Sequence, residues 1–175
     1  MTFAQLVLSS VLFFASMTDL RSRRIPNALI AIGLCAALAG GALGLTALSL
    51  SECLIGALVG LGLFLPLYVF RAVGAGDAKL MSVIGALVGG SAVVSVCVYT
   101  ALAGFAMAVL MLVRHGGWRR TCSDMIFLIH HAILRLSGQK LVVADLARTS
   151  SVRLPYAVAI TAGVVVWWLR GDVFF

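Results

Sequence analysis

The chain has 175 residues, of which 62% are hydrophobic and only 11% are charged. Because a soluble domain of this length carries roughly 25% charged residues, these proportions exclude an ordinary soluble protein and indicate a polytopic membrane protein. The net charge of +7 does not indicate a nucleic-acid-binding protein, because the basic residues lie in short stretches between apolar spans. We therefore expect an all-α membrane protein with the lipid bilayer, and no nucleic acid, as its partner.

Apolar stretches of roughly 20 residues, with about 17 as the lower limit, can cross the hydrocarbon core of a membrane. The apolar stretch from 80 to 113 is too long for one span at 1.5 Å per residue, and Gly89-Gly90-Ser91 is its natural break. The pattern therefore predicts about six transmembrane helices, over residues 3–18, 28–48, 53–70, 78–88, 92–113 and 155–169. The first of these does not match a cleavable signal peptide, because no basic region precedes it and three arginines follow it.

Lysines and arginines predict the orientation of these spans. Six spans place both termini on one side of the membrane, where only Arg170 of the 13 basic residues lies. The other basic residues fall in the segments on the opposite side, so those segments face the cytoplasm and both termini face outwards. We therefore expect a multi-pass protein of the bacterial or archaeal cytoplasmic membrane.

The polar segment 114–154 is expected to be a cytoplasmic or interfacial part of a single membrane-embedded domain, 1–175. Apolar residues recur within it at helical spacing, which indicates an amphipathic helix lying in the membrane interface. The adjacent His130 and His131 point in different directions and do not predict a metal site. The four cysteines are scattered, with no Cys-x-x-Cys pair, which favours small buried side chains over zinc ligands. We expect no metal and no cofactor.

Two aspartates carry the functional signal, in a chain with only six acidic residues. Asp19 stands where the first span ends, and Asp77 stands in Gly74-Ala75-Gly76-Asp77-Ala78-Lys79, where the fourth span begins. Carboxylates at the edge of a bilayer are costly and are functional by default. A pair of them can hydrolyse a peptide when one is ionised and activates water while the other is protonated and donates to the carbonyl oxygen. The pair therefore predicts an aspartyl protease with its active site at the cytoplasmic face.

The residues around Asp77 are candidates for binding substrate. Gly74 and Gly76 can adopt positive φ angles and present no side chain, so we expect them to let an extended substrate approach the carboxylates. Lys79 is a candidate substrate-binding or tuning residue, and it also fits a basic anchor at the cytoplasmic face. Structural roles are open for the aspartates as well, because Asp19 fits a polar span end and Asp77 fits an N-cap of the following helix.

These motifs resemble the type IV prepilin peptidase family of membrane aspartyl proteases. The matching segments are Asp19 with Arg21-Ser22-Arg23-Arg24-Ile25-Pro26-Asn27, then Gly74 to Leu80, then Leu154-Pro155-Tyr156-Ala157-Val158-Ala159-Ile160. The resemblance implies that Asp19 and Asp77 are the catalytic pair. It also implies that the substrates are type IV (Flp-type) prepilins or pseudopilins, whose leader is removed at the cytoplasmic membrane face. The pilus assembly machinery is a further candidate partner.

The absence of Cys-x-x-Cys pairs makes the chain similar to the short Flp/Tad-type form without a methyltransferase region, or to archaeal preflagellin peptidases. Two other functions stay open. Presenilin-like intramembrane proteases share Gly-x-Gly-Asp and act on other substrates, but they usually have a Tyr-Asp motif where this chain has Thr18 and Asp19. A non-catalytic membrane scaffold or small transporter would use the carboxylates for ion or proton binding, and would more often place them near the bilayer midplane.

Overall fold

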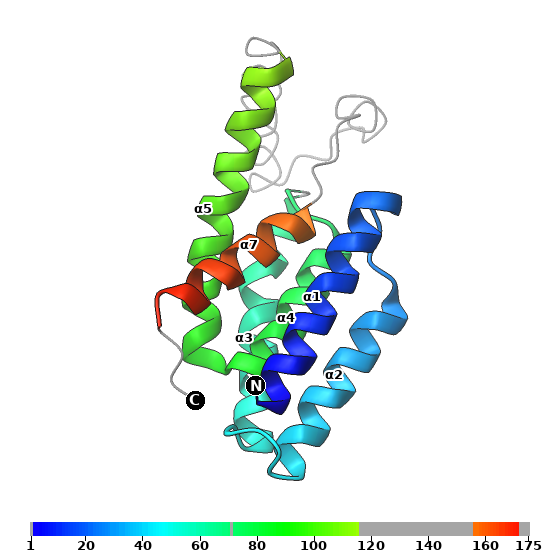
Figure 1. The fold of residues 1–175 in the computed structure, drawn as a ribbon, viewed down its shortest axis with the longest axis vertical. Coiled ribbons are helices and arrows are strands. Elements are labelled where there is room, and N and C mark those ends of the chain that lie inside the picture. Colours follow the sequence, from blue (N-terminus) through cyan, green and yellow to red (C-terminus); the bar gives the residue numbers. More distant parts are fainter. Residues whose placement is uncertain (1, 71, 116–155, 172–175) are drawn as a thin grey trace, which may run out of the picture. The chain divides into compact units, whose positions relative to one another are not determined.

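The structure, a computed structural model, describes residues 2–70, 72–115 and 156–171. The chain divides into two compact units, residues 1–104 with 155–175 and residues 105–154. In the second unit only the end of one helix is described. The described helices are α1 Phe3–Ser22, α2 Asn27–Ala42, α3 Leu50–Val69, α4 Ala75–Val88, α5 Gly90–His115 and α7 Tyr156–Leu169 (Figure 1).

The expected all-α architecture is confirmed for the described residues, which contain helices and turns but no strand. Three helical segments are long and apolar enough to cross a membrane: α1, α3 and Gly90–Leu110 of α5. The apolar helices α2 and α7 are shorter. The number of spans therefore stays a prediction. The amphipathic helix expected within 114–154, with its two histidines, falls on residues 116–155, which lie outside the described part of the chain.

The first helix is longer than the sequence pattern predicts. It continues past Thr18 to Ser22 and ends where Arg23 adopts a left-handed conformation with φ of 51°. The N–H of Arg23 donates to the carbonyl oxygen of Asp19 at 2.9 Å. Asp19 therefore lies in the last turn of α1 and not in the loop after it, because the polar residues that follow the apolar stretch continue the helix.

The second helix is shorter than predicted, ending at Ala42 instead of near residue 48. Gly44 has a φ of 66°, a conformation that glycine adopts without steric cost. The N–H of Leu45 then donates to the carbonyl oxygen of Gly40 at 2.8 Å. This is the hydrogen bond of a Schellman motif, which closes a helix even where the following residues are apolar.

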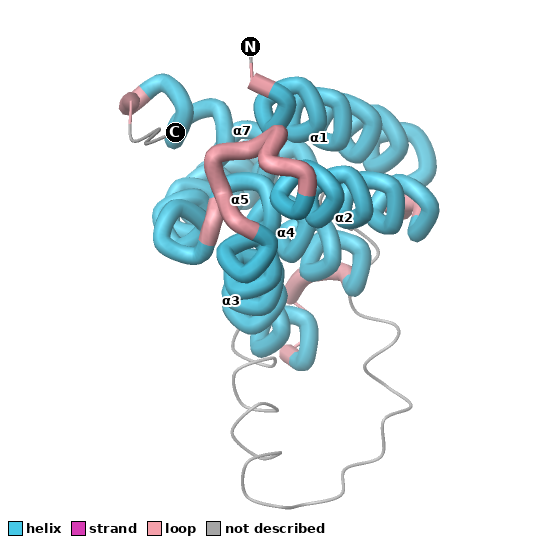
Figure 2. The backbone as a smooth tube through the Cα atoms, turned by 90° about the horizontal axis from the view of Figure 1, so that it is seen from below, coloured by secondary structure: helices cyan, strands magenta, loops and turns pink. Residues whose placement is uncertain are grey.

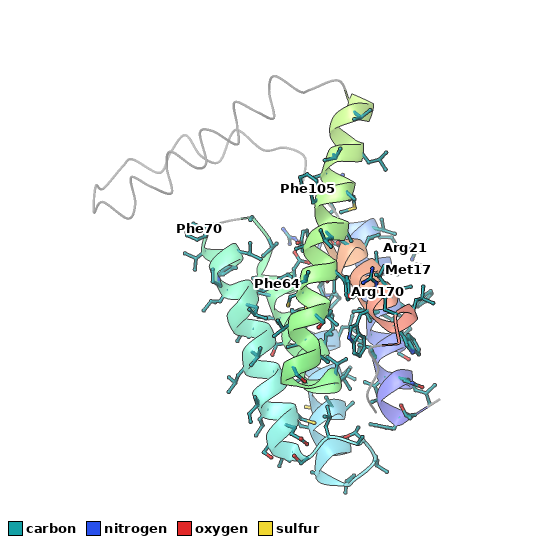
Figure 3. The ribbon with its side chains drawn as sticks, turned by 90° about the vertical axis from the view of Figure 1, so that its left-hand side faces the viewer. Met17, Arg21, Phe64, Phe70, Phe105 and Arg170 are labelled. Atoms are coloured by element: carbon teal, nitrogen blue, oxygen red, sulfur yellow. The ribbon has the colours of Figure 1, made fainter. Side chains whose placement is uncertain are left out.

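Helix α4 is the centre of the first unit. Almost every side chain from Leu80 to Val88 is buried, as expected for a short helix that is apolar on all sides. It packs mainly on α3 and also contacts α1, α2 and α7. Figures 1 and 2 show it between α3 on one side and α1 and α2 on the other. Large apolar side chains of α3, such as Leu58, are exposed, and so is Phe70, which follows the end of α3 and is labelled in Figure 3.

The contact between α3 and α4 is backbone against backbone. A Cβ atom added to Gly56 would overlap the carbonyl group of Gly85, and one added to Gly85 would overlap the carbonyl group of Gly56. One turn along α3, a Cβ atom on Gly60 would overlap the carbonyl group of Met81. Small residues four apart allow this approach. Because α4 is held this closely, the position of its first turn, which carries Asp77, is fixed by the bundle.

Candidate active site

Asp19 reaches the site from the last turn of α1, and its side chain is only 6% exposed. One carboxylate oxygen, Oδ2, accepts a hydrogen bond of 3.0 Å from the backbone N–H of Ala157. Ala157 lies in the first turn of α7, where the helix leaves its N–H groups without partners of its own. A buried carboxylate and an unpaired helix amide therefore satisfy each other across 138 residues of sequence.

Asp77 reaches the site from the first turn of α4, ahead of the apolar stretch 78–88, and is 9% exposed. Its Oδ2 accepts a hydrogen bond of 3.0 Å from the N–H of Gly74, the N-cap residue. Asp77 therefore closes the start of α4 from the third helical position and is not itself the N-cap. Burial raises the pKa of Asp77 to about 6, the hydrogen bond from Gly74 acts against this rise, and the charge of Asp19 adds to it.

Helices α1 and α4 are in contact, and the charge of Asp19 at the end of α1 raises the pKa of Asp77 at the start of α4. Asp19 and Asp77 are also the only two charged residues that are buried in the described part of the chain. In such a pair, the negative charge on one carboxylate disfavours ionisation of the other. The arrangement can thus hold one ionised and one protonated carboxyl group, which is what general base and general acid catalysis by a pair requires.

The glycines before Asp77 serve packing. Neither Gly74 nor Gly76 has the positive φ angle that the sequence allowed: Gly74 is extended with φ of −78°, as an N-cap residue should be, and Gly76 is helical. Their role in the approach of substrate stays a prediction. A Cβ atom on Gly74 would lie 3.1 Å from Oδ2 of Asp77, and one on Gly76 would lie 3.2 Å from Cβ of Ile25. The missing side chains therefore let the carboxyl group and the α1–α2 connection approach the start of α4.

Within the described residues, the side chain of Lys79 is paired with an amide and not with a carboxylate. Its Nζ donates a hydrogen bond of 3.0 Å to Oδ1 of Asn27, the first residue of α2, on the exposed side of the site. This bond joins the start of α4 to the connection that follows Asp19. A role of Lys79 in substrate binding stays a prediction, and the observed contact is one that holds the two aspartate-bearing segments together.

The described residues contain no group of three or more histidine, cysteine or acidic side chains that could hold a metal ion. A hollow of about 580 Å³ lies at the other end of α4, lined by residues that include Glu52, Ser91 and Trp167. Neither aspartate borders it. The end of α4 that carries Asp77 is therefore the candidate site, because the buried ionisable groups converge there.

Sequence reasoning missed Ala157. It contacts Asp19 through its backbone, so its side chain gives no signal, and its proximity depends on how α7 packs on α1. The only sequence pointer was the similarity of Pro155-Tyr156 and the residues after it to a segment of a known family. The contact of Asn27 with Lys79 was also missed, because a side-chain amide next to a proline has many structural uses.

Comparison with known proteins identifies the family of the chain. The model of the Type IV leader peptidase family matches residues 6–112, which include both aspartates and more than half of the chain. No curated protein and no solved structure matches the chain. The matched region holds α1 to α4 and most of α5, and so includes the helices that carry both buried carboxyl groups. The chain belongs to the Type IV leader peptidase family.

Proposed function

We propose that the protein is a membrane aspartyl endopeptidase that removes the leader peptide from type IV (Flp-type) prepilins or pseudopilins. Membership of a leader peptidase family supports peptide hydrolysis. The observation that carries the proposal is the pair of buried carboxyl groups, Asp19 and Asp77, at the ends of two helices that are far apart in sequence. Burial of two acids in an apolar bundle is costly, which favours a catalytic use.

In the proposed reaction, an ionised carboxylate takes a proton from water as the water attacks the scissile carbonyl carbon. The protonated partner donates its proton to the carbonyl oxygen, giving a tetrahedral intermediate. On collapse the C–N bond breaks, the group that took the water proton gives it to the departing amine, and its partner takes a proton back from a hydroxyl group of the intermediate. The pKa of Asp77, raised to about 6, supports a carboxyl group that keeps its proton close to neutral pH. The substrate backbone would enter beside the first turn of α4.

The proposed orientation supports the proposed substrate class. The basic leader of a prepilin stays in the cytoplasm while its hydrophobic segment lies in the bilayer, which presents the cleavage junction at the depth of the membrane edge. Asp19 and Asp77 lie at one end of α1 and α4, the end where Lys79 and the arginines after Asp19 are exposed. Positive charge of this kind marks the cytoplasmic side. The chain would act as one domain, with residues 114–154 at that same face.

The test is co-expression of a Flp-type prepilin with the wild-type protein, Asp19→Asn or Asp77→Asn, followed by measurement of the precursor mass in isolated membranes. We expect loss of the leader mass with the wild type only. Glu52→Gln is the matched control, because Glu52 is an exposed acid that caps the far end of α3, and it should process normally.

Processing by either asparagine variant at the wild-type rate would remove that aspartate from the proposed pair. Failure of the wild type to process several prepilins, combined with cleavage of other single-span membrane substrates, would favour the presenilin-like alternative. Failure with both classes, by protein that is correctly inserted in the membrane, would favour a scaffold or transporter.

A further inference from the structure

The glycine contacts between α3 and α4 define which residue of α3 stands beside Asp77. Gly60 of α3 lies against Met81 of α4, one turn along from the contact between the two glycines. The helices run in opposite directions, so one further turn along each of them brings Phe64 of α3 opposite Asp77 of α4. The ring of Phe64 is therefore at the level of the catalytic pair.

Helix α3 continues past this level, whereas α4 ends there. From Phe64 to its last residue, Val69, α3 rises by about 7.5 Å at 1.5 Å per residue. Helix α4 begins at Ala75, in the same turn as Asp77. The last residues of α3 therefore extend beyond the start of α4, at the end of the bundle where Asp77 stands.

Two side chains of this extension continue the face of α3 that packs on α4. Leu67 and Tyr68 follow Phe64 by three and four residues, so they lie on the same side of the helix. Phe64 is 2% exposed, whereas Leu67 and Tyr68 are 38% and 45% exposed. Within the described part of the chain, the face that is buried along α4 is thus left uncovered just past Asp77. Leu67 and Tyr68 are called the uncovered face below.

The uncovered face adjoins the segments that carry both carboxyl groups. The ring of Phe64, labelled in Figure 3, makes an edge contact with the ring of Tyr156 at 6.2 Å between centroids. Tyr156 directly precedes Ala157, whose N–H binds Asp19. The ring pair therefore connects the turn that holds Asp19 with the helix that faces Asp77, and the uncovered face begins one turn from this ring pair.

Charge separates the two sides of the site. The exposed basic side chains of α1 and of the connection after it include Arg21, Arg23 and Arg24. In contrast, residues 63–70 of α3 and its C-cap contain no charged side chain. Helix α4 lies between these two sides (Figure 1). A substrate with a basic leader and an apolar segment meets like charge on the α1 side and an uncharged apolar surface on the α3 side.

We propose that the uncovered face of α3 is the docking surface for the apolar helix of the substrate, whose first turns pack on Leu67 and Tyr68 directly after the scissile bond. The inference rests on the proposed function and names the surface that recognises the membrane segment of the substrate. A second copy of the chain seated on this face would obstruct the approach of a peptide to Asp77, which favours the substrate as the occupant.

The first test is kinetic, with prepilin cleavage measured at varied mole fractions of prepilin in proteoliposomes. Leu67→Ala/Tyr68→Ala should raise KM about tenfold and leave kcat unchanged, because an apolar contact made equally in the ground and transition states affects binding alone. The matched control is Leu65→Ala/Val69→Ala. It removes exposed apolar side chains from the same end of α3, on the face of Leu58 and away from α4, and should keep the wild-type KM.

The second test reports binding without cleavage. A photo-crosslinking benzoylphenylalanine is placed at position 68 or 69 of the full-length Asp77→Asn protein, which is irradiated in proteoliposomes with a Flp-type prepilin. We expect crosslinks from position 68 to the first two turns of the apolar segment of the prepilin. Position 69, on the opposite face of the same turn, should give none.

Four results would overturn the docking surface. Equal rises in KM for the two double variants, or equal crosslinking from positions 68 and 69, would reduce Leu67 and Tyr68 to general lipid contacts. Crosslinks from position 68 to a second copy of the chain would make the face a dimer contact. A fall in kcat without a change in KM would assign these side chains to the chemistry. Prepilin crosslinks from position 68 alone, combined with no cleavage by the wild type, would support the docking surface and count against the proposed function.

Discussion

Asp77→Asn should inactivate the protein and at the same time stabilise it. Well above pH 6 the wild-type fold must hold an ionised Asp77 in a buried position, whereas asparagine carries no charge. Asparagine can still accept the hydrogen bond from Gly74, because its Oδ1 replaces the carboxylate oxygen that accepts it at 3.0 Å. The start of α4 therefore keeps its cap, and the main difference between the two proteins is the cost of burying the charge.

The size of this cost follows from the pKa. A rise from the ordinary 3.8 to about 6 corresponds to about 3 kcal/mol, because each unit is worth about 1.36 kcal/mol. Because folding raises the pKa of this carboxyl group, its contribution to the stability of the fold becomes less favourable as the pH rises. Below about pH 4 the folded and unfolded forms are both protonated and there is no penalty. As the pH rises from about 4 to about 6, the unfolded form loses its proton first, so stability falls; above about 6 the full penalty applies.

Thermal unfolding in detergent measures this difference. A thiol-reactive dye can report unfolding when the exposed Cys35 is replaced by serine in all the proteins compared, because Cys53 is fully buried in the folded protein. We expect Asp77→Asn to unfold at a higher temperature than the wild type at about pH 8, with the difference vanishing near pH 4. Glu52→Gln, which changes an exposed acid whose ionised form is favoured by hydrogen bonds from Ser49, should not be more stable than the wild type at pH 8. A variant that is less stable than the wild type at pH 8, or equally shifted at both pH values, would refute the burial argument.

Two further predictions concern packing and the site periphery. Gly56→Ala should destabilise the protein by about 1–3 kcal/mol, because its methyl group meets the Gly85 carbonyl; the control Gly62→Ala, on the same helix with open space around it, should be neutral or stabilising by up to about 1 kcal/mol. Equal unfolding temperatures for these two variants would contradict the backbone contact. Lys79→Met and Asn27→Ala should each lower the cleavage rate partially and to a similar extent, and the double variant should be no worse than either. Additive losses in this cycle would show that Lys79 and Asn27 act separately.

Local features of the fold could be read from the sequence because they depend on short-range chemistry. Apolar runs located the six described helices, and Gly89, with a φ of 88°, separates α4 from α5 where the glycine pair indicated a break. Helix ends were less accurate. The predicted second span ran past Gly44, because hydropathy does not register a left-handed glycine, and the first stopped at Thr18, because hydropathy treats the polar last turn of α1 as a loop.

The sequence by itself also singled out Asp19 and Asp77, since acids are rare in an apolar chain and both stand at the ends of apolar runs. It could not say what each carboxyl group binds. The partner of Asp19 is a backbone amide 138 residues away, which every residue except proline possesses, so no side-chain pattern marks it. The approach of α3 to α4 at Gly56 and Gly85, and the packing of α7 on α1, bring these groups together. Only the tertiary structure decides which groups the two carboxyl groups contact, because contacts between distant segments depend on the shape of whole helix surfaces.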